Sequence, residues 1–179
     1  MHIGFDLDKI FVDYPPFVPD VLIDRIYKKK SNDTLLYRIP KKPEQLLRYF
    51  SHHPMFRPII KKNLTLLQKH VQKKQHTMYL ISSRFNFLKK RTDKLTTKYE
   101  FTRFFDDMFF NFENKQPHVF KDEVIKKLKL DRYVDDDLPL LTFLSKNHPQ
   151  THFFWLNTKK QDKLGNNLFA IKELSDIFS

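Results

Sequence analysis

Short apolar runs alternate with helix-length amphipathic stretches along most of this chain, and this alternation limits the possible folds more than any other feature. The runs have the length and the β-branched and aromatic content of buried strands. Strands that alternate with helices predict a parallel sheet covered by helices on both faces. The runs are His2–Phe5, Thr77–Ile81, Met108–Phe110, Arg132–Val134 and His152–Leu156.

Apolar side chains recur at helical spacing between most of these runs, which indicates amphipathic helices. We therefore expect a three-layer α/β/α, Rossmann-like sheet of about five parallel strands, and we expect residues Leu168 to Phe178 to form a closing helix. The stripes that predict the other helices are Ile60, Leu64, Leu67 and Val71; Leu88, Thr92, Leu95 and Tyr99; Phe120, Val124 and Leu128; and Leu141, Phe143 and Leu144.

One segment, residues 14–57, breaks the alternation. Seven of the ten prolines fall at or before Pro58, and proline ends helices and marks loops. Within the segment we expect short helices at Val21–Lys29 and Glu44–Phe50. The sequence thus predicts a core domain formed by residues 1–13 and 58–179, with a small, mainly helical cap, residues 14–57, inserted after the first strand.

The chain contains no cysteine, which excludes disulfides, cysteine-ligated zinc and thiol catalysis. Its apolar runs are all shorter than the ~18 residues that cross a bilayer, so we expect no membrane partner. A charged stretch followed by an apolar segment, as in a signal peptide, is not evident at the N-terminus. These features favour a cytoplasmic protein.

The formal net charge of +12 favours anionic partners such as phosphate esters, nucleic acid or acidic surfaces. The lysines, however, are scattered along the whole chain. Most of them are expected to line solvated helix faces, so a dedicated nucleic-acid surface is the lesser alternative.

Polar residues follow three of the predicted strands, where each one ends. They are Asp6-Leu7-Asp8, Ser82-Ser83-Arg84 and Asp135-Asp136-Asp137. Ligands of parallel α/β sheets bind at the carboxyl ends of the strands, so we expect these side chains to converge. Crowded carboxylates repel one another, and a cation relieves the repulsion. Because all the ligands are hard oxygens, Mg²⁺ is the natural cation.

Each motif also has a structural interpretation when it is taken alone. An Asp-x-Asp pair is common in turns, and Ser82-Ser83 or the three aspartates could cap the helices that follow them. Lys121 would normally be a solvated residue, although a cation early in a helix opposes the helix dipole. The ordered set of strand–Asp-x-Asp, strand–Ser, Lys and strand–Asp-Asp is much more specific than any one motif.

This set resembles the haloacid-dehalogenase-like (HAD) hydrolase superfamily, most of whose members are Mg²⁺-dependent phosphatases. The stretch from Lys121 to Asp136, the tetrapeptide Ile81-Ser82-Ser83-Arg84 and the additional Asp13 resemble the small deoxyribonucleotidase-like branch. The sequence departs from the family in having Lys9 and Ile10 where Gly and Thr are common.

The resemblance implies a role for each matched residue. Asp6 would be the nucleophile and Asp8 the general acid and base, while Ser82 and Lys121 would hold the phosphoryl oxygens. Ser83 and Arg84 would be further phosphate contacts. The Mg²⁺ ligands would be Asp6, Asp8, Asp135 and Asp136, and the run of three aspartates leaves open whether Asp135 or Asp136 is the direct ligand.

The implied activity is hydrolysis of a phosphate monoester on a small substrate, in its specific form a 5′-nucleotidase acting on (deoxy)nucleoside monophosphates. Aromatic residues of the insertion would suit base stacking, or could form the core of the cap. A phosphatase of sugar phosphates or other small metabolites is an alternative, and so is a non-catalytic protein that binds nucleic acid or a protein partner on the same fold. A response-regulator receiver domain also uses aspartate pairs and a lysine, but its nucleophilic aspartate ends a later strand.

Overall fold

The computed structural model describes residues 1–15, 28–29, 35–73, 75–157 and 164–178. Six parallel strands form its central sheet, in the order β5-β4-β1-β6-β7-β8. The five predicted strands are confirmed, with a sixth at the edge. The strands are β1 (His2–Phe5), β4 (Thr77–Ser82), β5 (Asp107–Phe110), β6 (Arg132–Asp135), β7 (His152–Leu156) and β8 (Leu168–Ile171).

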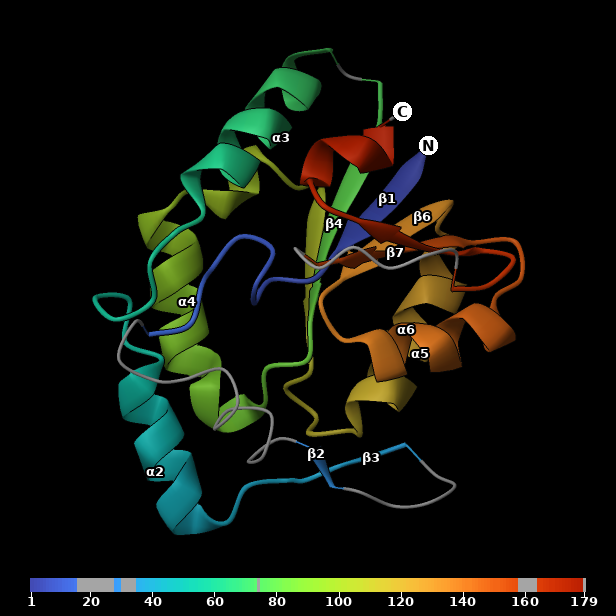
Figure 1. The fold of residues 1–179 in the computed structure, drawn as a ribbon. Coiled ribbons are helices and arrows are strands. Elements are labelled where there is room, and N and C mark those ends of the chain that lie inside the picture. The colour runs from blue at the N-terminus through green and yellow to red at the C-terminus, as the bar shows by residue number, and fades with distance from the viewer. Residues whose placement is uncertain (16–27, 30–34, 74, 158–163, 179) are drawn as a thin grey trace.

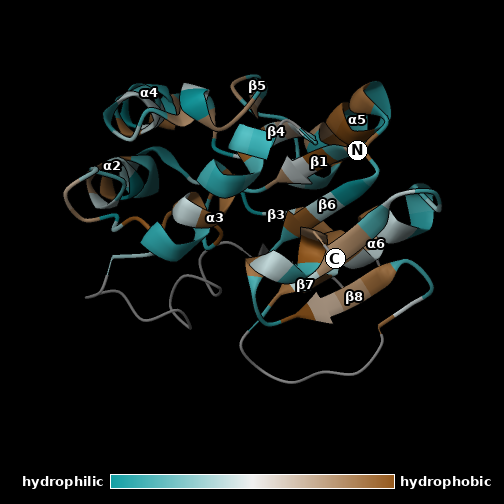
Figure 2. Ribbon diagram, turned by 90° about the horizontal axis from the view of Figure 1, so that it is seen from above, coloured by the Kyte–Doolittle hydropathy of each residue, from teal (hydrophilic) through white to brown (hydrophobic). Residues whose placement is uncertain are grey.

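Helices cover both faces of the sheet, as the alternation predicted. Helices α3 and α4 lie on one face, and α5 and α6 on the other (Figures 1 and 2). Their bounds are α3 (Lys61–Lys73), α4 (Lys89–Lys98), α5 (Pro117–Leu128) and α6 (Leu138–Asn147), with 3₁₀ turns at Asn86–Leu88, Phe101–Arg103 and Leu174–Phe178. No helix among the described residues is long and apolar enough to span a lipid bilayer.

Strand β1 lies in the middle of the sheet and pairs with both β4 and β6. From β1 the chain adds β4 and β5 on one side, and then returns to add β6, β7 and β8 on the other. The strand order therefore reverses beside β1. Open α/β sheets bind their ligands outside the carboxyl ends of the strands at such a reversal.

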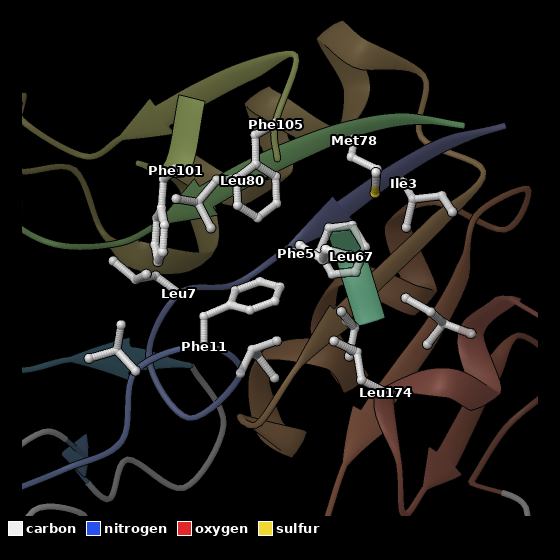
Figure 3. Packing of buried hydrophobic residues seen from close by; sticks show 14 of the residues in the cluster. Ile3, Phe5, Leu7, Phe11, Leu67, Met78, Leu80, Phe101, Phe105 and Leu174 are labelled. Atoms are coloured by element: carbon white, nitrogen blue, oxygen red, sulfur yellow. The ribbon is translucent and has the colours of Figure 1, made fainter. Parts of the chain in front are cut away.

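The two faces of β1 are covered by two different cores. Ile3 and Phe5 are fully buried against the α3 and α4 side, where Phe5 meets Leu67 and Phe105 (Figure 3). The opposite core contains Tyr133 and Ile81 together with residues of α5 and α6. Because β1 is covered on both faces, Ile3, Gly4 and Phe5 are all buried and none of them carries a polar side chain.

Gly4, at the centre of β1, leaves room for the second core, and Gly4→Ala is expected to destabilise the protein. A Cβ atom at position 4 would lie 2.5 Å from Leu130 Cδ1 and 2.9 Å from Tyr133 Cδ2. Overpacking of this kind costs about 1–3 kcal/mol. Gly165→Ala is the matched control, because the nearest atom to its Cβ would be 3.6 Å away. Urea denaturation should separate the two variants, and equal stability would contradict the close packing around Gly4.

The closing helix predicted for residues 168–178 is wrong in its first half. Leu168–Ile171 forms β8, which pairs with β7, and only Leu174–Phe178 is helical, as a 3₁₀ turn. Leu168 and Ile171 are both buried and lie three residues apart, which imitates the spacing of an amphipathic helix. Pairing with the exposed edge of β7 decides the outcome, and this is a tertiary contact.

The described part of the 14–57 segment lies on the side to which the carboxyl ends of the strands point (Figure 1). The helix predicted at Glu44–Phe50 is confirmed as α2 (Lys42–Ser51). Its first turn contains Pro43 and Glu44, and the Glu44 side chain accepts from the Lys41 backbone N–H. The helix predicted at Val21–Lys29 lies outside the described residues, except for its end. There the prediction is wrong, because β2 (Lys28–Lys29) pairs antiparallel with β3 (Leu36–Tyr37).

Candidate active site

A tight turn after β1 carries the two predicted catalytic aspartates. The backbone N–H groups of Phe11 and Val12 both donate to the Leu7 carbonyl, at 3.0 and 3.1 Å. Lys9 occupies the left-handed region at φ 63°, a conformation that glycine adopts at little cost. This explains why a glycine is common at this position in the family that the sequence resembles. The Lys9 ammonium is held 2.9 Å from Asp13 Oδ1 and 4.4 Å from the centre of the Tyr14 ring.

Lys121 joins Asp6 at the end of β1 to Asp135 at the end of β6. Its Nζ donates to Asp6 Oδ1 and to Asp135 Oδ2, each at 2.6 Å, and all three side chains are buried. The second oxygen of Asp6 accepts from the Asp8 backbone N–H at 2.9 Å. Lys121 can bridge the two strands because it lies in α5, on the crossover that connects β5 to β6.

The carboxylates of this cluster together carry more negative charge than one lysine can compensate. Burial, with the nearby charges of Asp135 and Asp8, raises the pKa of Asp6 to about 7 against the opposing effect of Lys121. Burial and the charges of Asp135 and Asp6 hold the pKa of Asp136 well above its ordinary value. The same carboxylates outweigh burial at Lys121 and hold its pKa well above the ordinary value.

Three carboxylates are close enough to share one cation. Asp6, Asp135 and Asp136 each offer an oxygen, and these oxygens lie within 4.8 Å of one another. A cluster of hard oxygens with excess negative charge suits a hard divalent cation such as Mg²⁺. Asp137, the third aspartate of the run, is turned away from them. It caps α6 at the Leu140 N–H and accepts from the Tyr37 hydroxyl at 2.7 Å.

Asp8 is held by two arginines instead of the lysine. Arg84 donates to both of its carboxylate oxygens, Nε to Oδ2 at 2.9 Å and Nη2 to Oδ1 at 2.7 Å, and Arg57 donates to Oδ1 as well. Burial alone would raise the pKa of Asp8, but the charges of Arg84 and Arg57 outweigh it and hold that pKa well below its usual range. The two predicted catalytic aspartates therefore occupy electrostatically opposite environments.

The other predicted residues line the same cavity, which has a volume of about 790 Å³. Ser82 is the last residue of β4 and is buried, and Ser83 follows it, half-buried, with no capping bond to the next helical turn. Arg84 is buried and does not lie on a solvated helix face. All of Asp6, Asp8, Ser82, Ser83, Arg84, Lys121, Asp135 and Asp136 line this cavity.

Sequence reasoning missed several residues of the site. Tyr133, whose hydroxyl donates to Asp135 Oδ2 at 2.9 Å, could have been found, because side chains two apart on a strand share a face. Arg57 and His52 carry no sequence signal, since both come from the irregular insertion. His52 is buried beside Asp8. Burial, together with the charges of Arg57 and Arg84, holds its pKa well below the ordinary value, so that the imidazole is neutral.

No protein-family model and no curated protein matches this sequence. Solved structures do match its fold. A haloacid dehalogenase-like family hydrolase from Streptococcus pneumoniae aligns with a TM-score of 0.59 and 12% identity, over 99% of this chain and 96% of its own. A HAD family enzyme from Bacteroides thetaiotaomicron, solved as an aspartate-to-alanine mutant in complex with magnesium and inorganic phosphate, aligns with a TM-score of 0.56 and 13% identity, over 89% and 95%.

A protein from Thermotoga maritima described as a β-phosphoglucomutase aligns with a TM-score of 0.58 and 10% identity, over 96% of this chain and 94% of its own. At such identities the likeness concerns the fold. It extends over nearly the full length of each partner, and the sheet order places the acidic cluster at the switch point of this fold. The chain therefore has the fold of the haloacid-dehalogenase-like hydrolases.

Proposed function

We propose that this protein is a Mg²⁺-dependent phosphatase that hydrolyses phosphate monoesters through an aspartyl-phosphate on Asp6. The observation that carries the proposal is that Lys121 Nζ contacts both Asp6 and Asp135 at 2.6 Å. Asp136 offers a further carboxylate oxygen to the same cluster, and Asp8 follows Asp6 by two residues in the chain. In this proposal these residues are the nucleophile, the cation that binds the phosphate and the metal ligands, all at one edge of the sheet. The fold shared with HAD hydrolases supports it.

In the first step, an Asp6 carboxylate oxygen would attack phosphorus while the bond from phosphorus to the leaving oxygen breaks. Asp8 would give a proton to that oxygen, so that an alcohol departs. The Lys121 ammonium and the Ser82 hydroxyl would hold the phosphoryl oxygens as charge develops on them. Lys121 is already fixed in place by its two carboxylate partners, which limits the reorganisation it needs.

In the second step, water would attack the phosphorus of the aspartyl-phosphate, lose a proton to Asp8, and release inorganic phosphate and the Asp6 carboxylate. The arginine partners keep Asp8 ionised, as a group must be before it can accept a proton, but they also lower its basicity. For the acidic role it must be protonated first. The negative charge of a bound substrate phosphate opposes the effect of the arginines and favours that protonation.

Asp6, Asp135 and Asp136 would hold the Mg²⁺ ion. The ion would offset the repulsion between the Asp6 carboxylate and the incoming phosphate. The second-sphere groups for such a site are present: Tyr133 donates to Asp135, and the Asp137 backbone N–H donates to Asp135 Oδ1 at 3.0 Å. These contacts fix the orientation of the carboxylate that lies deepest in the cluster.

Within this proposal, residues 14–57 form a cap over the core made by residues 1–13 and 58–179. Tyr37 and Arg48 of this segment line the cavity together with Trp155 of the core. A cavity of about 790 Å³ lies in the range that suits a drug-sized ligand, and aromatic walls suit a base. We therefore propose nucleoside monophosphates as the first substrates to test, and sugar phosphates as the second.

Turnover is expected to require a divalent cation. Release of inorganic phosphate should be measured across a panel of nucleoside monophosphates and sugar phosphates in the presence of Mg²⁺, and again in excess chelator. We expect turnover of at least one monoester with Mg²⁺, a fall to the level of an Asp6→Asn control in chelator, and recovery when Mg²⁺ is restored. Full turnover in chelator would contradict the metal site.

The panel also tests the alternative of a non-catalytic binding protein. That alternative predicts no turnover of any monoester, together with salt-dependent binding of nucleic acid, because phosphate contacts release counterions. The net charge of +12 is the observation in its favour.

A further inference from the structure

Arg57 stands where the inserted segment returns to the core. The segment leaves the core after Asp13 and returns before helix α3, and the two chains meet there: the Asp13 N–H donates to the Pro58 carbonyl at 2.8 Å, and Val12 forms an antiparallel bridge with Ile59. The backbone that directly follows Arg57 is thus paired with the end of the turn that carries the predicted catalytic aspartates.

The Arg57 guanidinium reaches from this junction to Asp8. Its Nη2 donates to Asp8 Oδ1, and only 2% of the side chain is exposed, although arginine is normally a surface residue. The Tyr14 ring lies 5.0 Å from Cζ, which adds a cation–π contact. Arg57 does not itself line the cavity, whereas Arg84, the other partner of Asp8, does. Arg57 therefore binds Asp8 without lining the cavity.

The two arginines that bind Asp8, Arg57 and Arg84, are not equivalent. Arg84 follows strand β4 and faces the substrate space, so that a bound phosphate can compete with Asp8 for its guanidinium. Arg57 is shielded from the cavity, and its contact with Asp8 can persist while substrate is bound. Arg57 is also buried at the point where the insertion joins the core. Because it donates to Asp8 Oδ1, the position of that oxygen depends on this junction.

We propose that Arg57 is a positioning residue that orients the Asp8 carboxylate toward the leaving oxygen. Through Arg57, this orientation depends on how the inserted segment packs against the core. The inference rests on the proposed phosphatase function. It assigns Arg57 no contact with substrate. Its effect should therefore appear only in the steps in which Asp8 gives or accepts a proton.

The test compares two monoesters whose leaving groups differ in their need for a proton. An alkyl phosphate releases a strongly basic alkoxide unless an acid protonates it, whereas p-nitrophenyl phosphate releases a stabilised phenolate. The value of kcat/KM is the correct readout, because it covers the steps up to departure of the leaving group and not the later hydrolysis of the aspartyl-phosphate. General acid catalysis contributes about 10²–10⁴-fold to such a step.

For Arg57→Met we expect kcat/KM on the alkyl phosphate to fall at least ~10-fold, and kcat/KM on p-nitrophenyl phosphate to change less than ~3-fold, since only the former uses the full effect of the acid. Arg57→Lys keeps a cation at the junction and should recover part of the loss. In an Asp8→Asn background, Arg57→Met should have no further effect on the alkyl phosphate. Arg103→Met is the matched control, because Arg103 also pairs with an acid, Glu100, but its side chain is 71% exposed.

Equal losses on both esters, or a further loss in the Asp8→Asn background, would show that Arg57 only supports the fold and would overturn the inference while leaving the phosphatase function intact. Faster turnover of the alkyl phosphate by Arg57→Met would also overturn it, since the arginine would then restrain the acid. Absence of turnover by the unmodified protein of both esters and of every nucleoside and sugar phosphate in the panel would overturn the proposed function, and the inference with it.

Discussion

Asp6→Asn is expected to reduce phosphate release by at least ~10⁴-fold, the scale seen when a covalent nucleophile is removed. An amide oxygen cannot displace the leaving group, whereas the geometry around it can persist. Burial already disfavours the charge of Asp6, as its raised pKa shows, so the neutral side chain should be tolerated and Lys121 should keep its contact with Asp135. Phosphate release under single-turnover conditions, with the thermal unfolding midpoint as a check of folding, measures both effects.

The control for Asp6→Asn is Asp93→Asn, which makes the same chemical change at a half-exposed aspartate paired with Lys89 on the surface of α4. It should leave both turnover and stability unchanged, because exposed pairs of this kind contribute little. Turnover by Asp6→Asn at the rate of the unmodified protein would show that the nucleophile is another residue.

Lys121→Met is expected to lower the free energy of unfolding by about 3–5 kcal/mol in the absence of divalent cations, the range for removing one partner of a buried ion pair. The Lys121 side chain is 3% exposed, and its loss would leave the oxygens of Asp6 and Asp135 facing each other without their shared cation. Methionine has nearly the same length, so the change removes the charge with little change in packing. Urea denaturation measures the loss.

Added Mg²⁺ should restore part of the stability of Lys121→Met, because a bound cation again compensates the carboxylates. Phosphate release should still be severely reduced, since the proposed donor to the phosphoryl oxygens is missing. Lys89→Met is the control, because this exposed lysine also pairs with an aspartate, and its loss should cost less than ~1 kcal/mol. Unchanged stability of Lys121→Met would contradict the central position of this lysine.

The sequence predicted the parts of the fold that depend on regular spacing. The first five strands of the central sheet have the predicted positions to within a residue, and the acidic and serine motifs meet because the carboxyl ends of parallel strands share an edge. Strand β8 was mistaken for a helix, because Leu168 and Ile171 are buried three residues apart and only pairing with β7 distinguishes the two possibilities. Local spacing cannot supply that distinction.

The environments of the two predicted catalytic aspartates could not be predicted from the motif. Asp6 and Asp8 are separated by one residue in the chain, and yet one faces a lysine and further carboxylates while the other faces two arginines. Arg57 belongs to a proline-rich segment without periodicity, so that no pattern relates it to Asp8. A pairing of that kind depends on where the irregular chain returns to the core, which only the folded structure reveals.

The half-buried indole of Trp155 gives the protein an optical probe inside its own site. Its Nε1–H donates to the Asp136 carbonyl at 2.9 Å, and Trp155 also lines the cavity. Since the chain contains a single tryptophan, its entire indole emission originates beside the acidic cluster. Metal or phosphate binding at that cluster can therefore be followed by intrinsic fluorescence, without a label and independently of any turnover.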